Sequence, residues 1–476
     1  MRRILTIVMF LVVLSRIEAH PWRPGHYIII DTDGGIDDMK AICMLLASPD
    51  VRVLAVTISP GALGTTNAYL KVRSLLNSFY HQGIPVGINR KASFRSPEFP
   101  AAKGMTWGDE VGIDPSKAPD FLAVINEIFK YEKIPVSYVC LGGLGNIAEA
   151  SSHIEGWDKH VKEIIWSSKG ATDISGFNYN TDPAAAKMIL NGKYPVRCII
   201  TGSEEKFFDE GLTGLIGTVN TPYAKKLTWL FKAPGSATHG FTFMATDELA
   251  ALYLQFPDMF KGEARGSIAD FTAADMIQLR QKSLKMLAGE TITKNQVLKV
   301  FPMEPSQYFD DIGPDVELIY NRYGENEFVS GVIANELHRH LGVFAIIGVK
   351  MGTRAREYFN TGVDEFSAAS MAGSVPPLSC MNDGIQVSTG ATPGHGLLTV
   401  INDSPRPVAE FTYMGRTIRL TLKKEIAAKM TSELKEINYV YGLDSDIYWE
   451  LVRKNAVRYW KELDRHEIFE IEEITR

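Results

Sequence analysis

The chain has 476 residues, of which 45% are hydrophobic, 22% charged and 10% aromatic, and its formal net charge is −6. This is the composition of a globular protein of two or three domains, and it excludes disordered, fibrous and collagen-like chains. A mildly acidic chain without a basic block is also a poor candidate for binding nucleic acid. We therefore expect no nucleic-acid partner.

The first 19 residues predict a secretory signal peptide. Arg2 and Arg3 precede an apolar run at residues 4–14, and residues 17–19 offer a cleavage site. The run is too short to cross a bilayer. No later stretch is apolar and long enough either, so we expect no membrane span in the mature form. The pattern favours a secreted or periplasmic protein, with an uncleaved anchor or a buried first strand as alternatives.

The four cysteines do not form a disulfide scaffold pattern. Cys43, Cys140 and Cys198 lie inside apolar runs, where cysteine acts as a small buried hydrophobe. Cys380 differs from them because it lies in a more polar, loop-like segment.

Short β-branched runs alternate with amphipathic segments over the first half of the chain. Strands are predicted at residues 26–30, 51–58, 135–140, 164–167 and 196–201, and helices at residues 36–47, 65–79, 118–130, 144–151 and 183–191. This alternation predicts an α/β fold, an open and mostly parallel sheet with helices on both faces. Such sheets bind ligands at the carboxyl ends of their strands.

The alternation stops after residue 260. We predict one apolar helix at residues 332–349, a hairpin within residues 397–422, and a charged helical tail from residue 423. We place a domain boundary near residue 325, which gives a first domain at residues 25–325 and a second at residues 326–476.

Four carboxylates lie within eight residues where the first strand turns into the first helix. They are Asp31, Asp33, Asp37 and Asp38, in the segment IIIDTDGGIDD. Four like charges this close repel one another strongly when they lose water. A hard divalent cation such as Ca²⁺ or Mg²⁺ removes that penalty and prefers oxygen ligands. The cluster therefore predicts a metal site.

The acidic cluster has other possible interpretations. The carboxylates could be solvated or cap the helix, without a metal. Asp31 could be the nucleophile of a phosphatase, with Asp33 as its acid. An EF-hand is excluded because Ile42 stands at the twelfth position of the loop, where a bidentate Glu is required.

Four segments, in order, resemble the inosine/uridine-preferring nucleoside hydrolases. They are IIIDTDGGIDDMKAICMLLASPDVRVLAVTIS, LGGLGNIAEA, GFNYNTDPAAAKMIL and ATDELAALYLQFPDMF, between Gly25 and Phe260. The family's acidic motif has Pro where this chain has Gly34.

The resemblance implies a Ca²⁺ ion that binds the ribose hydroxyls and a water. It implies four ligands, which are Asp33, Asp38, the backbone carbonyl of Leu141, and Asp247. Asp33 is also implied as the general base, and Asp37 and Asn178 as sugar contacts. Carboxylates beneath the sugar suit the oxocarbenium-like transition state of N-glycosidic cleavage.

Several substrate-contacting positions of the family are changed here. The residues that stand in place of the family's His, Glu, Asn, Met-Gly-Gly and loop His are Thr246, Gly176, Ala62, Ser167 to Lys169, and Trp107. Three interpretations remain open. The chain could hydrolyse another ribosyl or furanosyl compound, or it could be a nucleoside hydrolase in which Trp107, Asp109 or another residue assists the leaving group. It could also be a metal-bearing binding protein. Trp107 and Trp166 could stack on a base or belong to the core.

The second half resembles the FmdE family, which is related to a subunit of formylmethanofuran dehydrogenase. The segments are ELHRHLGVFAIIGVKMG, PPLSCMNDGIQVSTGATPGHGLL and the hairpin after them. The resemblance implies a smaller α+β domain. His338, His340 and Cys380 are a possible second metal site, suited to Zn²⁺, which Asp383 and His395 could complete. The alternatives are ordinary surface and core histidines, and a partner-binding or oligomerisation role.

The sequence thus predicts a Ca²⁺-dependent hydrolase of an N-glycosidic bond in a nucleoside or related ribosyl compound, with Asp33 activating the water. The alternative from a different class is a metal-dependent protein that binds or senses a ribosyl ligand without turnover. We expect a small nucleoside-like substrate and a homo-oligomer.

Overall fold

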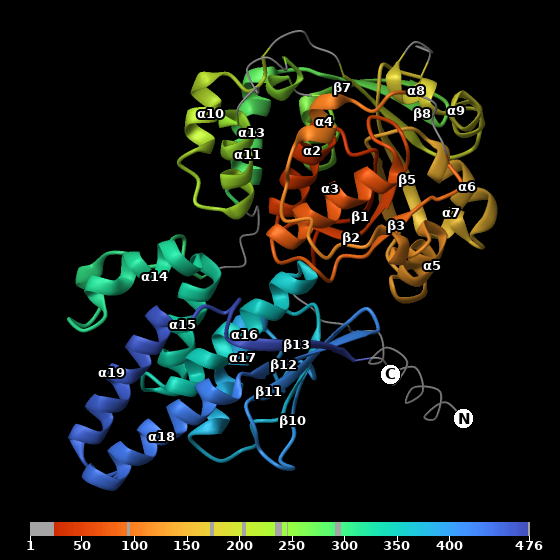
Figure 1. The fold of residues 1–476 in the computed structure, drawn as a ribbon. Coiled ribbons are helices and arrows are strands. Elements are labelled where there is room, and N and C mark those ends of the chain that lie inside the picture. Colours follow the sequence, from red (N-terminus) through yellow and green to blue (C-terminus); the bar gives the residue numbers. More distant parts are fainter. Residues whose placement is uncertain are drawn as a thin grey trace, which may run out of the picture.

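The computed structural model describes residues 23–92, 96–171, 176–201, 206–233, 240–244, 246–290 and 297–474. The predicted signal peptide lies outside these residues. The described chain folds around two sheets, each with its own helices (Figure 1).

The first sheet has eight strands in the order β3-β2-β1-β4-β5-β6-β8-β7. Their bounds are β1 His26–Thr32, β2 Val51–Ile58, β3 Val86–Ile88, β4 Val136–Cys140, β5 Val161–Ser168, β6 Val196–Ile200, β7 Phe260–Arg265 and β8 Ile268–Ala273. All neighbouring pairs are parallel except β7 with β8. The predicted mostly parallel sheet is confirmed, whereas the strands β3, β7 and β8 were missed.

Helices cover both faces of this sheet. The α-helices of this part are α2 Ile36–Ala47, α3 Thr65–Ser78, α4 Pro100–Gly104, α5 Phe121–Tyr131, α6 Gly145–His153, α7 Trp157–His160, α8 Phe177–Thr181, α9 Pro183–Leu190, α10 Glu210–Ile216, α11 Pro222–Lys232, α12 Glu248–Gln255 and α13 Met276–Leu287. Along β1, Ile28 and Ile30 join the core under α2, while Ile29 joins the core under α5 and α6. This alternation is what a strand buried on both faces requires.

The second part is built on a five-stranded sheet in the order β10-β9-β11-β12-β13. Its strands are β9 Ser367–Ser370, β10 Leu398–Val400, β11 Val408–Tyr413, β12 Arg416–Leu422 and β13 Phe469–Ile474. Its α-helices are α14 Val316–Tyr323, α15 Glu325–His338, α16 Val343–Phe359, α17 Met381–Thr389, α18 Lys424–Tyr441 and α19 Asp446–Glu462. Apart from the parallel pair β9 and β10, the strands are antiparallel, so the predicted smaller α+β fold is confirmed.

Three predictions for this part were wrong in detail. The single helix at residues 332–349 is two helices, because Arg339 adopts a left-handed conformation (φ 69°) that ends α15. The hairpin is limited to β11 and β12, while β10 pairs with β9. The helical tail ends in strand β13, which pairs with β12.

The boundary between the parts stays a prediction, but packing favours a position upstream of residue 325. Ile312, Val316 and Ile319 already belong to the core of the second part. The parts meet where the Gly83 backbone N–H donates to the carbonyl of Tyr358 (2.8 Å). Within the described residues, no helix is both long and apolar enough to cross a membrane.

Candidate active site

The acidic segment forms the turn between β1 and α2. Gly34 has φ 79°, a backbone conformation that residues with a Cβ rarely adopt. This conformation allows the sharp turn that follows β1. At Gly61, in the loop after β2, a Cβ would lie 2.0 Å from Oδ2 of Asp33. A glycine here therefore leaves room for the Asp33 carboxylate.

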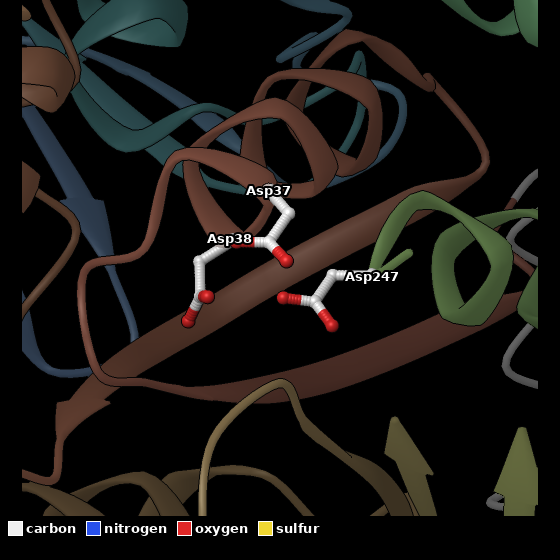
Figure 2. A group of neighbouring side chains, drawn as sticks. All are labelled: Asp37, Asp38 and Asp247. Carbon is white, nitrogen blue, oxygen red and sulfur yellow. The ribbon is translucent and has the colours of Figure 1, made fainter. Parts of the chain in front are cut away.

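Three carboxylates from two distant stretches of chain converge beside this turn. Asp37 and Asp38 project from the first turn of α2, and Asp247 stands at the start of α12 (Figure 2). One oxygen from each lies within 4.8 Å of the others. In the part of the chain that the structure describes, no other group of His, Cys, Asp or Glu brings three ligand atoms this close. The structure thus brings together the predicted ligands Asp38 and Asp247, with Asp37 instead of the predicted ligand Asp33 as the third member of the group.

Neighbouring hydroxyls hold each carboxylate in place. Asp38 Oδ1 accepts from Thr32 Oγ1 (2.5 Å) and from the Asp33 backbone N–H (3.1 Å). Ser167 Oγ, at the end of β5, donates to Asp247. Thr246 Oγ1 donates to Asp37 Oδ2 (2.8 Å). In the sequence, Ser167 and Thr246 stand out only as departures from a family pattern. Their position at a strand end and next to Asp247 was the available signal for this supporting role.

The carboxylates are held in an environment that disfavours their charge. Burial, followed by the charge of Asp37, raises the pKa of Asp38 to about 6. Burial, followed by the charges of Asp37 and Asp38, raises the pKa of Asp247 well above its ordinary value. One carboxylate oxygen of Asp38 lies within 4.8 Å of one of Asp247. Two carboxylates this close need a proton or a cation between them, and an all-oxygen set fits a hard divalent cation.

Asp33 lies beside this group and is almost fully buried. Its Oδ1 accepts from the Gly35 backbone N–H (3.2 Å). Burial, followed by the charge of Asp38, raises the pKa of Asp33 well above its ordinary value. Gly142, directly after Leu141, approaches it closely, since a Cβ there would lie 3.4 Å from Asp33 Cβ.

The predicted backbone ligand is held by a predicted sugar contact. The Leu141 carbonyl accepts from Asn178 Nδ2 (2.6 Å), which also donates to the carbonyl of Ser167 (3.0 Å). Asn178 therefore links the end of β5 to the segment after β4, and its amide N–H groups already have partners within the chain.

Asp31 plays a different part from its neighbours. Its side chain is fully buried, and its two oxygens accept hydrogen bonds from Thr57 (2.6 Å), Ser59 (2.6 Å) and Asn146 (2.6 Å). A nucleophile must instead reach a substrate with a free lone pair. The arrangement ties three elements together beneath the acidic turn, and it does not support the phosphatase interpretation.

The two tryptophans considered as base-stacking residues are both in the core. Trp107 is 1% exposed and packs edge-on against Trp229, and its carbonyl accepts from Lys226 on α11. Trp166 is fully buried, with its indole N–H donating to the Gly142 carbonyl (3.0 Å). The structure therefore does not present Trp107 as the substrate contact that was predicted, because its ring is covered by neighbouring side chains.

The possible second metal site is only partly assembled. The rings of His338 and His340 are adjacent, with centroids 4.1 Å apart, and His338 Nδ1 pairs with Asp383 Oδ2 (2.7 Å). Cys380 is buried, and burial raises the pKa of its thiol to about 11. His395 pairs with Asp364 instead. Among the described residues, these side chains do not bring three ligand atoms within 4.8 Å of one another, and the possible second metal site stays a prediction.

Comparison with known proteins agrees with this geometry. Residues 28–300, more than half of the chain, match the family described as inosine-uridine preferring nucleoside hydrolase. This chain belongs to that family. The enzyme class expected from the sequence, a nucleoside hydrolase-like glycosidase of unspecified substrate, is thereby confirmed. Residues 337–469 match the family described as FmdE, Molybdenum formylmethanofuran dehydrogenase operon.

Individual relatives match between about a third and somewhat more than half of the chain. The non-specific ribonucleoside hydrolase RihC of Escherichia fergusonii is 26% identical over 246 residues, which are 49% of this chain and 80% of the relative. The pyrimidine-specific ribonucleoside hydrolase RihA of Shewanella oneidensis is 30% identical over 190 residues, 36% of this chain and 57% of the relative. A solved plant nucleoside hydrolase, PpNRh1, is 20% identical with a TM-score of 0.45 and matches 56% of this chain and 100% of its own.

Proposed function

We propose that this chain hydrolyses the N-glycosidic bond of a nucleoside or a related ribosyl compound, with Ca²⁺ as its cation. The observation that carries the proposal is the convergence of Asp37, Asp38 and Asp247 on one point, where burial and the charge of Asp37 raise the pKa values of the other two. The ribonucleoside hydrolases among the relatives support the substrate class.

The residues present fit a hard divalent ion. Asp38 and Asp247 would hold it, with Asp33 or Asp37 and the Leu141 carbonyl completing an oxygen shell. When bound, such an ion supplies positive charge that attracts sugar hydroxyls and lowers the pKa of a nearby water.

The side chains of this site would supply the base and the groups that stabilise the transition state. Asp33 would take a proton from the attacking water, since it is the buried carboxylate next to the ligand group. The surrounding carboxylates would stabilise the positive charge that develops on the sugar ring. Thr246, where the family has a histidine, donates to Asp37, so it does not replace an acid that assists the leaving base.

The second candidate function is binding or sensing of a ribosyl ligand without turnover. It is favoured by the changed substrate contacts, in particular Gly176 and Thr246, and by the burial of Trp107. Both functions use the same cation site, so only a turnover measurement separates them.

The test is to incubate the full chain with a panel of ribonucleosides and ribosyl compounds, with Ca²⁺ or with a chelator, and to measure released reducing sugar. We expect release that depends on Ca²⁺. Bound Ca²⁺ with no release from any substrate would favour the binding protein. Release that is unchanged by the chelator would refute the cation site.

Three further predictions remain proposals. We propose secretion or a periplasmic location, which cell fractionation would test, and a homo-oligomer, which light scattering would test. In the second part we propose Zn²⁺ binding by His338, His340 and Cys380. The adjacent imidazoles and the Asp383 carboxylate that orients one of them support it. Loss of zinc from His338→Ala, measured by elemental analysis, is the expected result.

A further inference from the structure

A buried lysine lies next to the acidic group, on the same helix. Lys40 of α2 is fully buried, and its Nζ forms an ion pair with Glu248 Oε1 (2.5 Å), which is fully buried too. The same ammonium donates to the carbonyls of Met244 (2.8 Å) and Thr242 (3.2 Å). These three partners of the ammonium group, Thr242, Met244 and Glu248, all lie within a few residues of Asp247 in the chain.

That segment carries Asp247. Asp247 precedes α12 but makes no capping hydrogen bond to its own helix, because its carboxylate is turned toward Asp38 and Ser167. The start of α12 is instead fixed by Glu248, whose Oε2 accepts from the Thr246 backbone N–H (2.9 Å). Lys40 thus holds the residues on both sides of Asp247 without relying on the Asp247 side chain.

Asp37 and Lys40 are three residues apart, so they lie on the same face of α2. Two links connect this face to the start of α12, namely Thr246 with Asp37 and Glu248 with Lys40. Repulsion among the three carboxylates pushes the two stretches apart. A cationic anchor buried beside them opposes that push.

We propose that Lys40 is a positioning residue of the cation site, which sets the distance between Asp247 and Asp38 by tying the turn before α12 to α2. The inference rests on the proposed function, because it concerns the same site. It goes beyond that function in assigning the assembly of the site to a residue outside the proposed ligand set.

The test is the direction in which Ca²⁺ affinity changes when Lys40 is replaced, because positioning and electrostatics alone predict opposite directions. Removing a positive charge near a cation site should strengthen Ca²⁺ binding if only charge matters. If Lys40 positions Asp247, the variant Lys40→Met should weaken it, by about 10- to 100-fold, as for other residues that hold metal ligands in place. The double variant K40M/E248M removes both charges and avoids leaving Glu248 buried and unpaired. It should weaken binding as well, whereas electrostatics predicts little change.

The chain offers a matched control. Lys350 and Glu327 form a second fully buried ion pair of the same length (2.5 Å), in the other part of the molecule. Lys350→Met should lower the midpoint of thermal unfolding but leave Ca²⁺ affinity unchanged. Affinity is measured by calorimetric titration of Ca²⁺ into the chelator-treated full chain, without any substrate.

Each outcome decides between the claims. Wild-type protein that binds no Ca²⁺ would refute the proposed function itself. Wild-type protein that binds, together with a folded Lys40 variant that binds as tightly or more tightly, would overturn the role of Lys40 alone. Failure of both Lys40 variants to fold while Lys350→Met folds would also overturn it, because the pair would then hold the domain rather than the site.

Discussion

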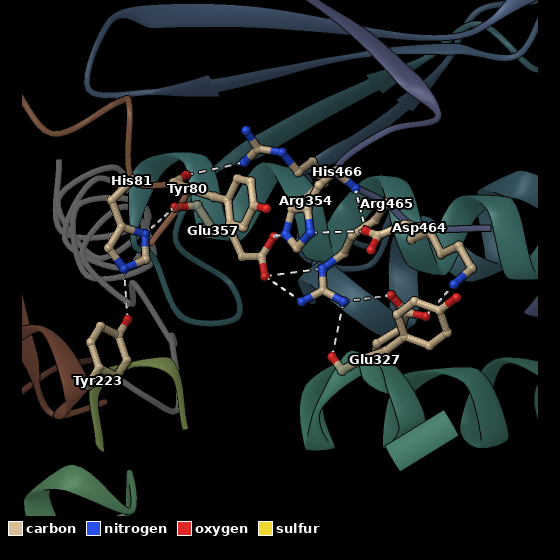
Figure 3. Close-up of polar contacts among 11 residues, drawn as sticks. Tyr80, His81, Tyr223, Glu327, Arg354, Glu357, Asp464, Arg465 and His466 are labelled. Atoms are coloured by element: carbon tan, nitrogen blue, oxygen red, sulfur yellow. Dashed lines mark hydrogen bonds and ion pairs between the residues drawn. The ribbon is translucent and has the colours of Figure 1, made fainter. Parts of the chain in front are cut away.

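Two buried clusters of charged side chains dominate this molecule, and they differ in one respect. In the acidic group, Asp38 and Asp247 face other carboxylates, and their pKa values are raised. In the second cluster each carboxylate meets a cationic side chain. We call it the junction cluster, and its members are Glu327, Lys350, Glu357, Asp464, Arg465 and His466. Figure 3 labels all of them except Lys350. Burial alone would raise the pKa of Glu357, but Arg465 and His466 lower it below its ordinary value.

The two clusters differ in whether cationic side chains balance the buried carboxylates. The junction cluster supplies its own countercharge, and it lies where Tyr80 stacks on His466 (3.5 Å between ring centroids) and Arg354 donates to the Tyr80 carbonyl (3.2 Å). Its ion pairs join residues of the second part, and its His466 ring contacts the first part at Tyr80. The acidic group has no such internal balance among its three members. It is stable at neutral pH only with protons or with a cation from outside.

The largest effect is expected for Asp33→Ala. This change removes the proposed base and a carboxylate next to the cation, so kcat should fall by at least about 10²- to 10⁴-fold. Reducing-sugar release measures the rate, and circular dichroism checks that the fold is kept. Asp258→Ala, at an exposed carboxylate, is the control. Turnover at the wild-type rate in Asp33→Ala would refute the assignment of Asp33.

Glu357→Gln should be the most destabilising single change in the junction cluster. It leaves Arg465 and His466 without their shared anion, and breaking such a pair costs about 3 kcal/mol where the group is mostly buried. Urea unfolding of the full chain measures the loss. Glu436→Gln, at an exposed position, should change stability little. Equal effects of the two changes would mean that the ion pairs of Glu357 do not stabilise the second part.

Unlike Glu357→Gln, the change Asp247→Asn should stabilise the folded protein when no cation is present. Removing one of three repelling carboxylates should stabilise the chelator-treated protein by about 1–2 kcal/mol, while Asn can still accept from Ser167. The same change should abolish the stabilisation that Ca²⁺ gives the wild type, about 2.7 kcal/mol at a hundredfold excess over Kd. Thermal unfolding with and without Ca²⁺ measures both effects. A destabilised Asp247→Asn in chelator would contradict the contrast between the clusters.

Local features of this architecture could be predicted from the sequence, and long-range ones only in part. Helix α2 has the predicted bounds because its apolar spacing and the glycines before it are local signals. Strand β13 was missed because FEIEEI is rich in charge and its partner, β12, lies far earlier in the chain. The break at Arg339 depends on one left-handed residue that no periodicity reveals.

The candidate site shows the same limit. The meeting of Asp38 with Asp247 followed from a family resemblance, since nothing local links residues so far apart in the chain. Which carboxylate completes the group depends on side-chain orientation, and here Asp37 rather than Asp33 lies within reach of both. Lys40 and Glu248 look like ordinary surface charges in the sequence. Only packing shows that both are fully buried and paired.

The smallest expected effect concerns pH at the junction. His81 is buried, with Nδ1 on the Glu357 carbonyl (2.6 Å) and Nε2 on Tyr223 Oη (2.7 Å), and burial lowers its pKa to about 4. Below about pH 6.5, His81 is therefore protonated in the unfolded chain but stays neutral in the folded chain. Stability from His81 is present above that pH and is lost as the pH falls toward 4.

His81→Gln keeps a polar group at this position but does not titrate. Between pH 7 and pH 5 the wild type should lose about 2 kcal/mol more than this variant, measured by urea unfolding. His466 should act in the other direction. Burial lowers its pKa, but Asp464 and Glu357 raise it by more, so its contribution is full below its unfolded pKa and is lost as the pH rises through the folded value. His466→Gln should therefore cost more at pH 5 than at pH 8, and equal pH slopes in all three proteins would show that neither histidine senses the junction.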